Sequence, residues 1–274
     1  MGDLLSLESP AAAATPAAVP AGAAGTVADP FDLMGGMGAP AASASPVLPV
    51  LLTADKGKGV QVAGAMTREG GQLVYQLAFT NTGPLPLNGF MIQFNKNFFG
   101  LGPVGQLQVP PLQPNGGAAT TSLGLAVNPA QAAPAFSPKV QVAIKNVTTG
   151  DVLYLVDSVP LRVVASEDGA MDQATFPAAW ESLGGEQKVQ LPVTPPAGDV
   201  LSTRLRSQNL FLVASREGPK TLTYFSGKLG APFNAPVLVE VSTSAGAAGV
   251  GIVCKCPRPD VVPLVFAAVQ AACS

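Results

Sequence analysis

Hydrophobic and polar residues alternate in several short runs between residues 58 and 159. The clearest run covers residues 72–81 and places four large apolar side chains on one face: Leu73, Tyr75, Leu77 and Phe79. Runs with the same two-residue period cover residues 58–68, 89–98, 139–147 and 151–159. A period of two predicts strands with one buried face, and the Asn-Thr-Gly and Thr-Thr-Gly turns between them favour antiparallel pairing. This part of the chain is therefore predicted to form an antiparallel β-sandwich.

The pattern becomes mixed from about residue 165 onward. Residues 177–182 and 197–208 predict short helices, the second with Asp199 as its N-cap. Strand-like runs follow at residues 209–216, 220–229, 236–243 and 250–256. Residues 259–273 predict an apolar helix capped by Asp260, with Pro263 in its first turn. An α+β unit is therefore expected behind the β unit.

The first 50 residues have a different composition, with 14 Ala, 7 Pro and 6 Gly and no basic residue. A segment with so few aromatic and β-branched residues cannot bury enough apolar surface to offset the entropy of ordering. We therefore expect a disordered hinge or linker at residues 1–50, a β-sandwich subdomain at 51–164 and an α+β subdomain at 165–274.

Charge and cysteine content exclude several classes of partner. The formal net charge is −2, whereas nucleic-acid phosphates require clustered Lys and Arg, so no nucleic-acid partner is expected. No apolar run is long enough to span a bilayer, so no direct membrane insertion is expected either. The chain start lacks a secretory signal, and three cysteines cannot build a disulfide scaffold, which favours reduced thiols in the cytoplasm.

The chain has no histidine, which removes Ser-His-Asp and Cys-His nucleophile pairs and His-ligated zinc. Chemistry through carboxylates, lysine or tyrosine stays open, but we expect no enzyme and no cofactor. Cys254 and Cys256 could offer two ligands to a soft metal, or they could be small hydrophobic residues of a core strand. The acidic pair in residues 167–169 is interpreted as a turn, and the glycine-rich residues 100–105 as a loop without a following helix.

Five stretches resemble, in their order and spacing, the C-terminal appendage of clathrin-adaptor β-adaptins together with the preceding hinge. They are GFMIQFNKNFFGLGP (89–103), QVAIKN (141–146), EDGAM (167–171), FPAAW (176–180) and CKCPRPDV (254–261). The resemblance covers about residues 47–274. It implies an immunoglobulin-like sandwich followed by an α+β platform, and a protein-binding module without catalytic activity.

The same resemblance implies two binding sites. Four positions match the lining of a platform groove that takes short peptide motifs from endocytic accessory proteins: Trp180, Arg216, Tyr224 and Glu240. Taken alone, Trp180 could equally be a core residue, since most lone tryptophans are. A second site, on the sandwich side, corresponds to Tyr154. Two positions depart from the family, because Glu181 stands where a lysine is usual and Lys188 where an acid is usual. An altered charge preference of the groove is therefore expected.

The hinge carries a pentapeptide that resembles the clathrin box, which the N-terminal propeller of the clathrin heavy chain receives. Its residues are Leu4, Leu5, Leu7 and Glu8, with Ser6 between them. In an extended chain Leu5 and Leu7 project to one side, and Glu8 can meet a basic rim. Residues 29–34 (DPFDLM) resemble motifs that accessory proteins offer to adaptor ears, and they could equally be a second clathrin contact or a chance match.

We therefore hypothesise a β-adaptin hinge end and appendage that recruits clathrin heavy chain and accessory proteins to coated vesicles and pits. It would be cytoplasmic and peripheral, at the plasma membrane or at the Golgi and endosomes. Other adaptor subunits would be reached through a trunk absent from these 274 residues. Three alternatives are weaker. The clathrin box argues against the appendage of the coatomer γ subunit, and no convincing pair of acids supports a carboxylate-based hydrolase on a β-sandwich. The missing signal and disulfide disfavour an extracellular adhesion sandwich.

Overall fold

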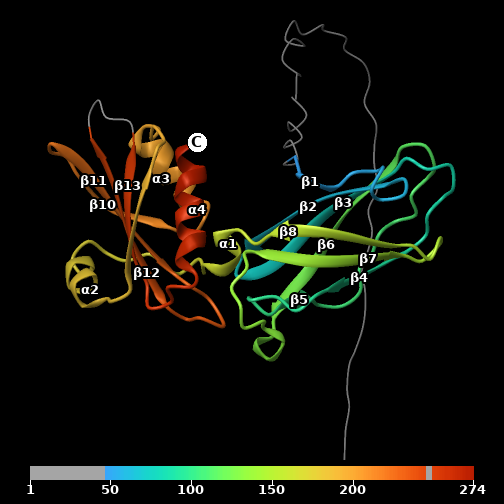
Figure 1. The fold of residues 1–274 in the computed structure, drawn as a ribbon, viewed down its shortest axis with the longest axis horizontal. Coiled ribbons are helices and arrows are strands. Elements are labelled where there is room, and N and C mark those ends of the chain that lie inside the picture. The colour runs from blue at the N-terminus through green and yellow to red at the C-terminus, as the bar shows by residue number, and fades with distance from the viewer. Residues whose placement is uncertain (1–46, 245–248) are drawn as a thin grey trace, which may run out of the picture. The chain divides into compact units, whose positions relative to one another are not determined.

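The computed structural model describes residues 47–244 and 249–274 (Figure 1). The pentapeptide at Leu4–Glu8, the segment Asp29–Met34 and nearly all of the predicted hinge lie outside the described residues. The strands are β1 Val50–Leu52, β2 Val60–Glu69, β3 Gln72–Asn81, β4 Phe90–Phe94, β5 Leu101–Pro103, β6 Gly117–Val127, β7 Lys139–Asn146, β8 Val152–Ser158, β9 Glu186–Leu191, β10 Phe211–Arg216, β11 Lys220–Lys228, β12 Pro236–Ser244 and β13 Val250–Lys255. The helices are α1 Leu161–Val164, α2 Phe176–Ser182, α3 Gly198–Arg206 and α4 Val262–Cys273, with a 3₁₀ turn at Pro129–Gln131.

Two antiparallel sheets form the sandwich, one in the order β1-β2-β3-β6-β5 and the other in the order β4-β7-β8. The inward faces bury the alternating apolar positions, so Tyr75, Leu77 and Phe79 of β3 are all buried, as their spacing predicts. A Gly70-Gly71 turn with positive φ at both residues joins β2 to β3, a backbone conformation that suits a tight hairpin. The predicted fold class, a β-sandwich followed by an α+β part, is confirmed.

A third antiparallel sheet, in the order β10-β11-β12-β13-β9, forms the platform. Helices α3 and α4 pack against each other and cover one of its faces (Figure 1). Helix α4 buries its apolar residues there, including Val262, Val265 and Val269. The opposite face carries α2, whose Trp180 ring lies against Tyr224 of β11. The platform therefore has one face closed by helices and one face partly open.

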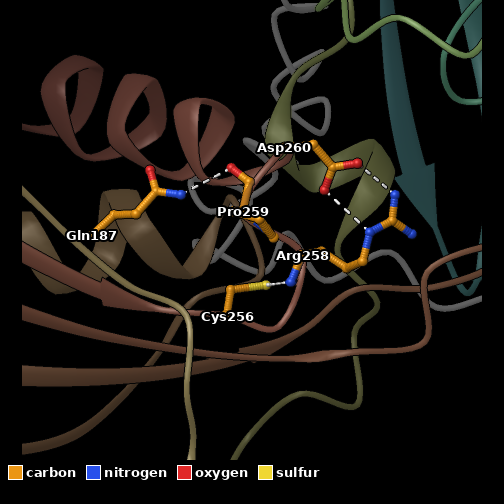
Figure 2. A network of polar contacts seen from close by, with 5 residues as sticks. All are labelled: Gln187, Cys256, Arg258, Pro259 and Asp260. Atoms are coloured by element: carbon orange, nitrogen blue, oxygen red, sulfur yellow. Dashed lines mark hydrogen bonds and ion pairs between the residues drawn. The ribbon is translucent and has the colours of Figure 1, made fainter.

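Both predicted helix caps are wrong. Helix α3 begins at Gly198 with Ala197 as its N-cap, so Asp199 lies in the first turn. Helix α4 begins at Val262 with Val261 as its N-cap and Pro263 in its first turn. The Asp260 carboxylate instead forms an ion pair of 2.5 Å with the Arg258 guanidinium, as Figure 2 shows. A charged partner two residues away thus competes successfully with the helix backbone for this carboxylate.

The loop before α4 is held by further contacts in Figure 2. The Gln187 side-chain amide donates a hydrogen bond of 3.1 Å to the Pro259 carbonyl, and the Arg258 amide donates one of 3.4 Å to the Cys256 sulfur. The Arg258 guanidinium also lies 4.5 Å from the centre of the Phe233 ring. The stretch CKCPRPDV therefore orders the junction between the platform sheet and α4.

The acidic pair Glu167 and Asp168 forms a turn, as predicted. The Lys228 ammonium lies 2.6 Å from the Asp168 carboxylate, and the Ser166 hydroxyl donates to the same group. These contacts hold the pKa of Asp168 down at about 2. No helix within residues 47–244 and 249–274 is long and apolar enough to cross a membrane.

Candidate functional site

Helix α2 is placed on the open platform face by contacts at its start. The Asp172 carboxylate accepts hydrogen bonds from the Thr175 amide at 2.9 Å and from the Thr175 hydroxyl at 3.0 Å. These bonds lower the pKa of Asp172 and close a turn immediately before the helix. The Ser226 hydroxyl of β11 accepts a hydrogen bond of 2.9 Å from the Met171 amide, which fixes the approach to the sheet.

The far end of α2 is fixed by a glycine. Gly185 has a φ of +75°, and a Cβ atom there would lie 2.0 Å from the Cys256 carbonyl oxygen. The chain can therefore turn from α2 into β9 at this point only with glycine, because any side chain would collide with backbone. The helix is short, and both of its ends are determined by the sheet.

Three aromatic rings meet under α2. Phe176 and Trp180, four residues apart, lie on the same side of the helix and stack with ring centres 5.6 Å apart. Tyr224 contacts both, with centres 5.4 Å from Phe176 and 5.9 Å from Trp180. Phe176 is buried, whereas Trp180 and Tyr224 are half-buried. The cluster thus presents two aromatic surfaces to solvent on a fixed base.

Strand register brings the other predicted residues to the same face. Tyr224 of β11 lies opposite Ala214 of β10 and Glu240 of β12, and Arg216 follows two residues after Ala214. Burial is the main cause that raises the pKa of the Tyr224 hydroxyl, and the Glu240 carboxylate raises it further. The neutral phenol is therefore the form held next to Glu240 near neutral pH.

A pocket of about 360 Å³ lies between α2 and β10, and we call it the platform groove. Its lining comprises Gln173, Phe176, Pro177, Trp180, Glu181, Val213, Ala214, Ser215, Arg216 and Tyr224. Three of the four residues predicted for the groove, Trp180, Arg216 and Tyr224, are thus brought together. Glu240 is not one of the lining residues; it lies on the neighbouring strand β12, directly opposite Tyr224. An apolar floor with a few charged groups at the rim suits a peptide side chain.

Several lining residues were not predicted from the sequence. Phe176 had a signal, since its spacing of four from Trp180 places both rings on one side of a short helix. Residues 213–215 had none, because small residues on an edge strand acquire a role only through their pairing with β11.

Glu181 and Lys188, for which the resemblance implies a lysine and an acid, lie on different parts of the open face. Glu181 is exposed at the rim of the groove and forms no ion pair with the residues that the structure describes. Lys188 lies on β9, two strands from Glu240, and pairs with Glu186 at 2.8 Å. The charges of the groove rim are therefore Glu181 on α2 and Arg216 on β10, and Lys188 is engaged elsewhere.

The remaining candidates lie away from the groove. Tyr154 is on β8 of the sandwich and is 73% exposed. Cys254 and Cys256 are buried and reduced, and within the described ranges no group of three or more His, Cys, Asp or Glu could hold a metal ion. Residues 100–105 contain the short strand β5 and no helix, as interpreted from the sequence.

A β-sandwich followed by a platform that carries an aromatic groove is the architecture that the resemblance to adaptin appendages implies. The family "Adaptin C-terminal domain" matches residues 48–155, and the family "Beta2-adaptin appendage, C-terminal sub-domain" matches residues 166–273. The chain therefore belongs to the β-adaptin appendage family.

Relatives of known identity support this assignment. The chain is 35% identical to "AP-1 complex subunit beta-1" of Mus musculus and 34% identical to that of Homo sapiens, over 95% of this chain and 28% of each relative. It is 24% identical to "AP-1 complex subunit beta" of Dictyostelium discoideum, over 78% of this chain and 23% of that relative. The chain thus spans less than a third of the length of these proteins.

Proposed function

We propose that this chain recruits clathrin and accessory proteins as the hinge end and appendage of a β-adaptin in coated-vesicle transport. The observation that carries the proposal is the platform groove, where Trp180 and Tyr224 are half exposed on a β-adaptin appendage. The chain acts in the cytoplasm as a peripheral component of coated vesicles and pits, and it has no catalytic role. The mammalian relatives are named as subunits of the AP-1 complex, which supports a place in an adaptor complex.

The groove binds short linear motifs of accessory proteins. Trp180 and Tyr224 supply aromatic surface, the kind of side chain that dominates binding energy at protein interfaces. Arg216 and Glu240 supply charges that orient the motif. The sandwich at 51–164 carries a second contact at Tyr154, and the platform at 165–274 carries the groove.

The hinge pentapeptide binds the clathrin heavy chain through Leu4, Leu5, Leu7 and Glu8. Burying three leucines yields about 5–9 kcal/mol, and fixing five backbone residues costs about 5–10 kcal/mol. The two terms nearly cancel, so hydrogen bonds and the Glu8 charge leave a weak contact. Many such contacts on one lattice bind tightly through avidity, which suits a coat that assembles and disassembles. Membership of the β-adaptin family favours this reading over the coatomer and hydrolase alternatives.

The test is a pulldown from cytosol on the immobilised chain. Four variants are compared with wild type: the triple change of Leu4, Leu5 and Leu7 to alanine; a control triple change of Val19, Val27 and Met37 to alanine; Trp180→Ala; and Arg216→Ala. The control triple removes comparable apolar surface from the same segment outside the pentapeptide. Arg216→Ala changes an exposed residue of the groove rim, where little effect on folding is expected. A loss of accessory proteins in both groove variants therefore cannot be explained by a folding defect of Trp180→Ala.

Clathrin heavy chain should be lost in the leucine triple and kept in the other three. Accessory proteins should be lost in Trp180→Ala and reduced in Arg216→Ala. Clathrin that is absent from wild type, or retained by the leucine triple, would refute the role of the pentapeptide. Accessory proteins retained by both groove variants would refute the role of the groove.

A further inference from the structure

Residues 192–197, between β9 and α3, form a loop that is rich in proline and has no helix or strand. Thr194 is flanked in this loop by Pro192 and Pro195. A proline ring fixes its own φ near about −65° and biases the preceding residue toward an extended conformation. Ala197, the last residue of the loop, has a φ of −51° and a ψ of 148°, close to polyproline II geometry. The loop therefore presents Thr194 within a short extended segment.

Few contacts hold this loop to the platform. In the part of the chain that the structure describes, no hydrogen bond involves the backbone of residues 192–196. Val193 is half-buried and packs against the hydrophobic core. Segments with few buried apolar contacts and no backbone hydrogen bonds open locally at a small free-energy cost. A short stretch around Thr194 can therefore leave the surface while the rest of the platform stays folded.

The Thr194 hydroxyl is exposed, and it forms no hydrogen bond with another described residue. One other Ser-Pro or Thr-Pro pair, Ser137-Pro138, lies within the described ranges, and its hydroxyl is engaged. The Ser137 hydroxyl accepts a hydrogen bond of 3.1 Å from the Lys139 amide and donates one of 3.4 Å to the Lys139 carbonyl. Ser137 is half-buried and lies directly before the start of β7. Of these two residues, only Thr194 combines an exposed, unengaged hydroxyl with a loosely held backbone.

We propose that Thr194 is a phosphorylation site for a proline-directed protein kinase. Such a kinase binds its substrate as an extended segment and selects proline directly after the reacting residue, which is the position of Pro195. In the reaction the Thr194 Oγ1 atom attacks the γ-phosphorus of ATP. The bond from this phosphorus to the oxygen that bridges it to the β-phosphorus breaks, and ADP leaves. The catalytic aspartate of the kinase accepts the hydroxyl proton.

The phosphorylated loop would lie at the edge of the platform sheet that is opposite the groove. The groove lies beside β10, the loop follows β9, and three strands separate β10 from β9 in the sheet. Four strand spacings give about 19 Å between the two edges. This distance exceeds the Debye length of about 8 Å at physiological ionic strength. A phosphate adds a charge of about −1.5 to −2, so it would about double the net charge of −2 without changing the groove.

The test is phosphorylation of the whole chain by a purified mitogen-activated protein kinase with ATP. Three further Ser-Pro or Thr-Pro pairs lie in the first 46 residues and are removed from the background chain by three substitutions: Ser9→Ala, Thr15→Ala and Ser45→Ala. Three variants are made in this background: Thr194→Ala, Pro195→Ala and, as the matched control, Ser137→Ala. Mass spectrometry of proteolytic peptides follows the phosphate on each residue over time. A synthetic peptide of residues 188–199 gives the rate for the same sequence without the fold.

Thr194 of the folded chain should gain phosphate at a rate within about tenfold of the rate for the peptide. Incorporation should be lost in Thr194→Ala, unchanged in Ser137→Ala and slowed about tenfold or more in Pro195→Ala. The fluorescence emission of Trp180, the sole tryptophan, should be the same with and without the phosphate, because the groove is unchanged.

A peptide that the kinase does not modify would overturn the proposal, because the sequence would then not be a substrate. A folded chain that reacts more than about tenfold more slowly than the peptide would overturn it as well, because the fold would then protect Thr194. Phosphate on Ser137 in place of Thr194 would have the same consequence. A shift of the Trp180 emission on phosphorylation would refute the separation of this site from the groove. The test needs only a kinase and ATP, so its result is independent of whether clathrin and accessory proteins are captured from cytosol.

Discussion

The ammonium of Lys255 on β13 lies 5.0 Å from the centre of the Trp180 ring on α2 and donates a hydrogen bond of 2.7 Å to the Trp180 carbonyl oxygen. The Lys255 side chain is only 13% exposed and also lies 3.7 Å from the Glu186 carboxylate of β9. One side chain thus joins the last turn of α2 to two strands of the sheet. The position of Trp180 at the groove depends on this lysine.

Replacing Lys255 with methionine should loosen α2 while keeping most of the packing volume. A cation–π contact and a charged hydrogen bond at a mostly buried site are lost, so the free energy of unfolding should fall by about 1–3 kcal/mol. Trp180 is the sole tryptophan, so its fluorescence emission should shift to longer wavelength in the native state. Urea titration followed by fluorescence measures both effects. The exposed substitution Lys220→Met should change neither, and an unshifted Lys255→Met spectrum would contradict this role.

The groove rim should select ligands by charge. A synthetic peptide of residues 27–36 of this chain carries two aspartates around Phe31 and serves as an acidic probe. Glu181→Lys should strengthen its binding about three- to fivefold and Arg216→Glu should weaken it by a similar factor, as expected for exposed charge pairs. Quenching of Trp180 fluorescence gives the affinity. A scrambled peptide of the same composition provides the control, and equal binding of both peptides would show that residues 29–34 are not a groove motif.

The strands that the sequence predicts well are those whose burial is one-sided. Alternation in β3 is complete because every second residue faces the sandwich core, so its bounds could be predicted. Strand β6 was missed because its first half consists of Gly, Ala and Thr, which pack beside β3 without large apolar side chains. Strand β9 was missed because the polar Gln187 lies opposite the buried Cys254, which leaves only Val189 and Leu191 to indicate the period of two.

The candidate site could be predicted only in part for a related reason. Trp180, Arg216 and Tyr224 came from the family resemblance, and their convergence follows from pairing between β10 and β11 that no local pattern encodes. The predicted N-caps at Asp199 and Asp260 are wrong for different reasons. Asp199 lies inside the first turn of α3, and the Asp260 carboxylate forms an ion pair with Arg258. Long-range register and competition between hydrogen-bond partners both lie beyond a local pattern.

The three cysteines should be unreactive in the folded protein. Burial is the main cause that raises the pKa of the Cys254, Cys256 and Cys273 thiols, so little thiolate is present near neutral pH. Modification by a disulfide reagent should be about a hundredfold or more slower than in denaturant, where all three thiols should react. Absorbance of the released thiol measures the rate. Rapid reaction of one native thiol would show that this cysteine is more accessible than its burial indicates.

Asp157 and Asp172 should give the free energy of unfolding opposite dependences on pH, because the pKa of Asp157 is raised and that of Asp172 is lowered. Burial raises the pKa of Asp157 above its unfolded value, so the folded state retains the proton longer and its stability falls as pH rises through that interval. Asp157→Asn should therefore increase the free energy of unfolding at neutral pH, with the gain vanishing below the unfolded pKa.

Hydrogen bonds from Thr175 lower the pKa of Asp172, so Asp172→Asn should cost stability at neutral pH, and that cost should disappear as pH falls. Urea unfolding of both variants between acid and neutral pH measures the two slopes, and slopes of the same sign would show that burial does not govern Asp157.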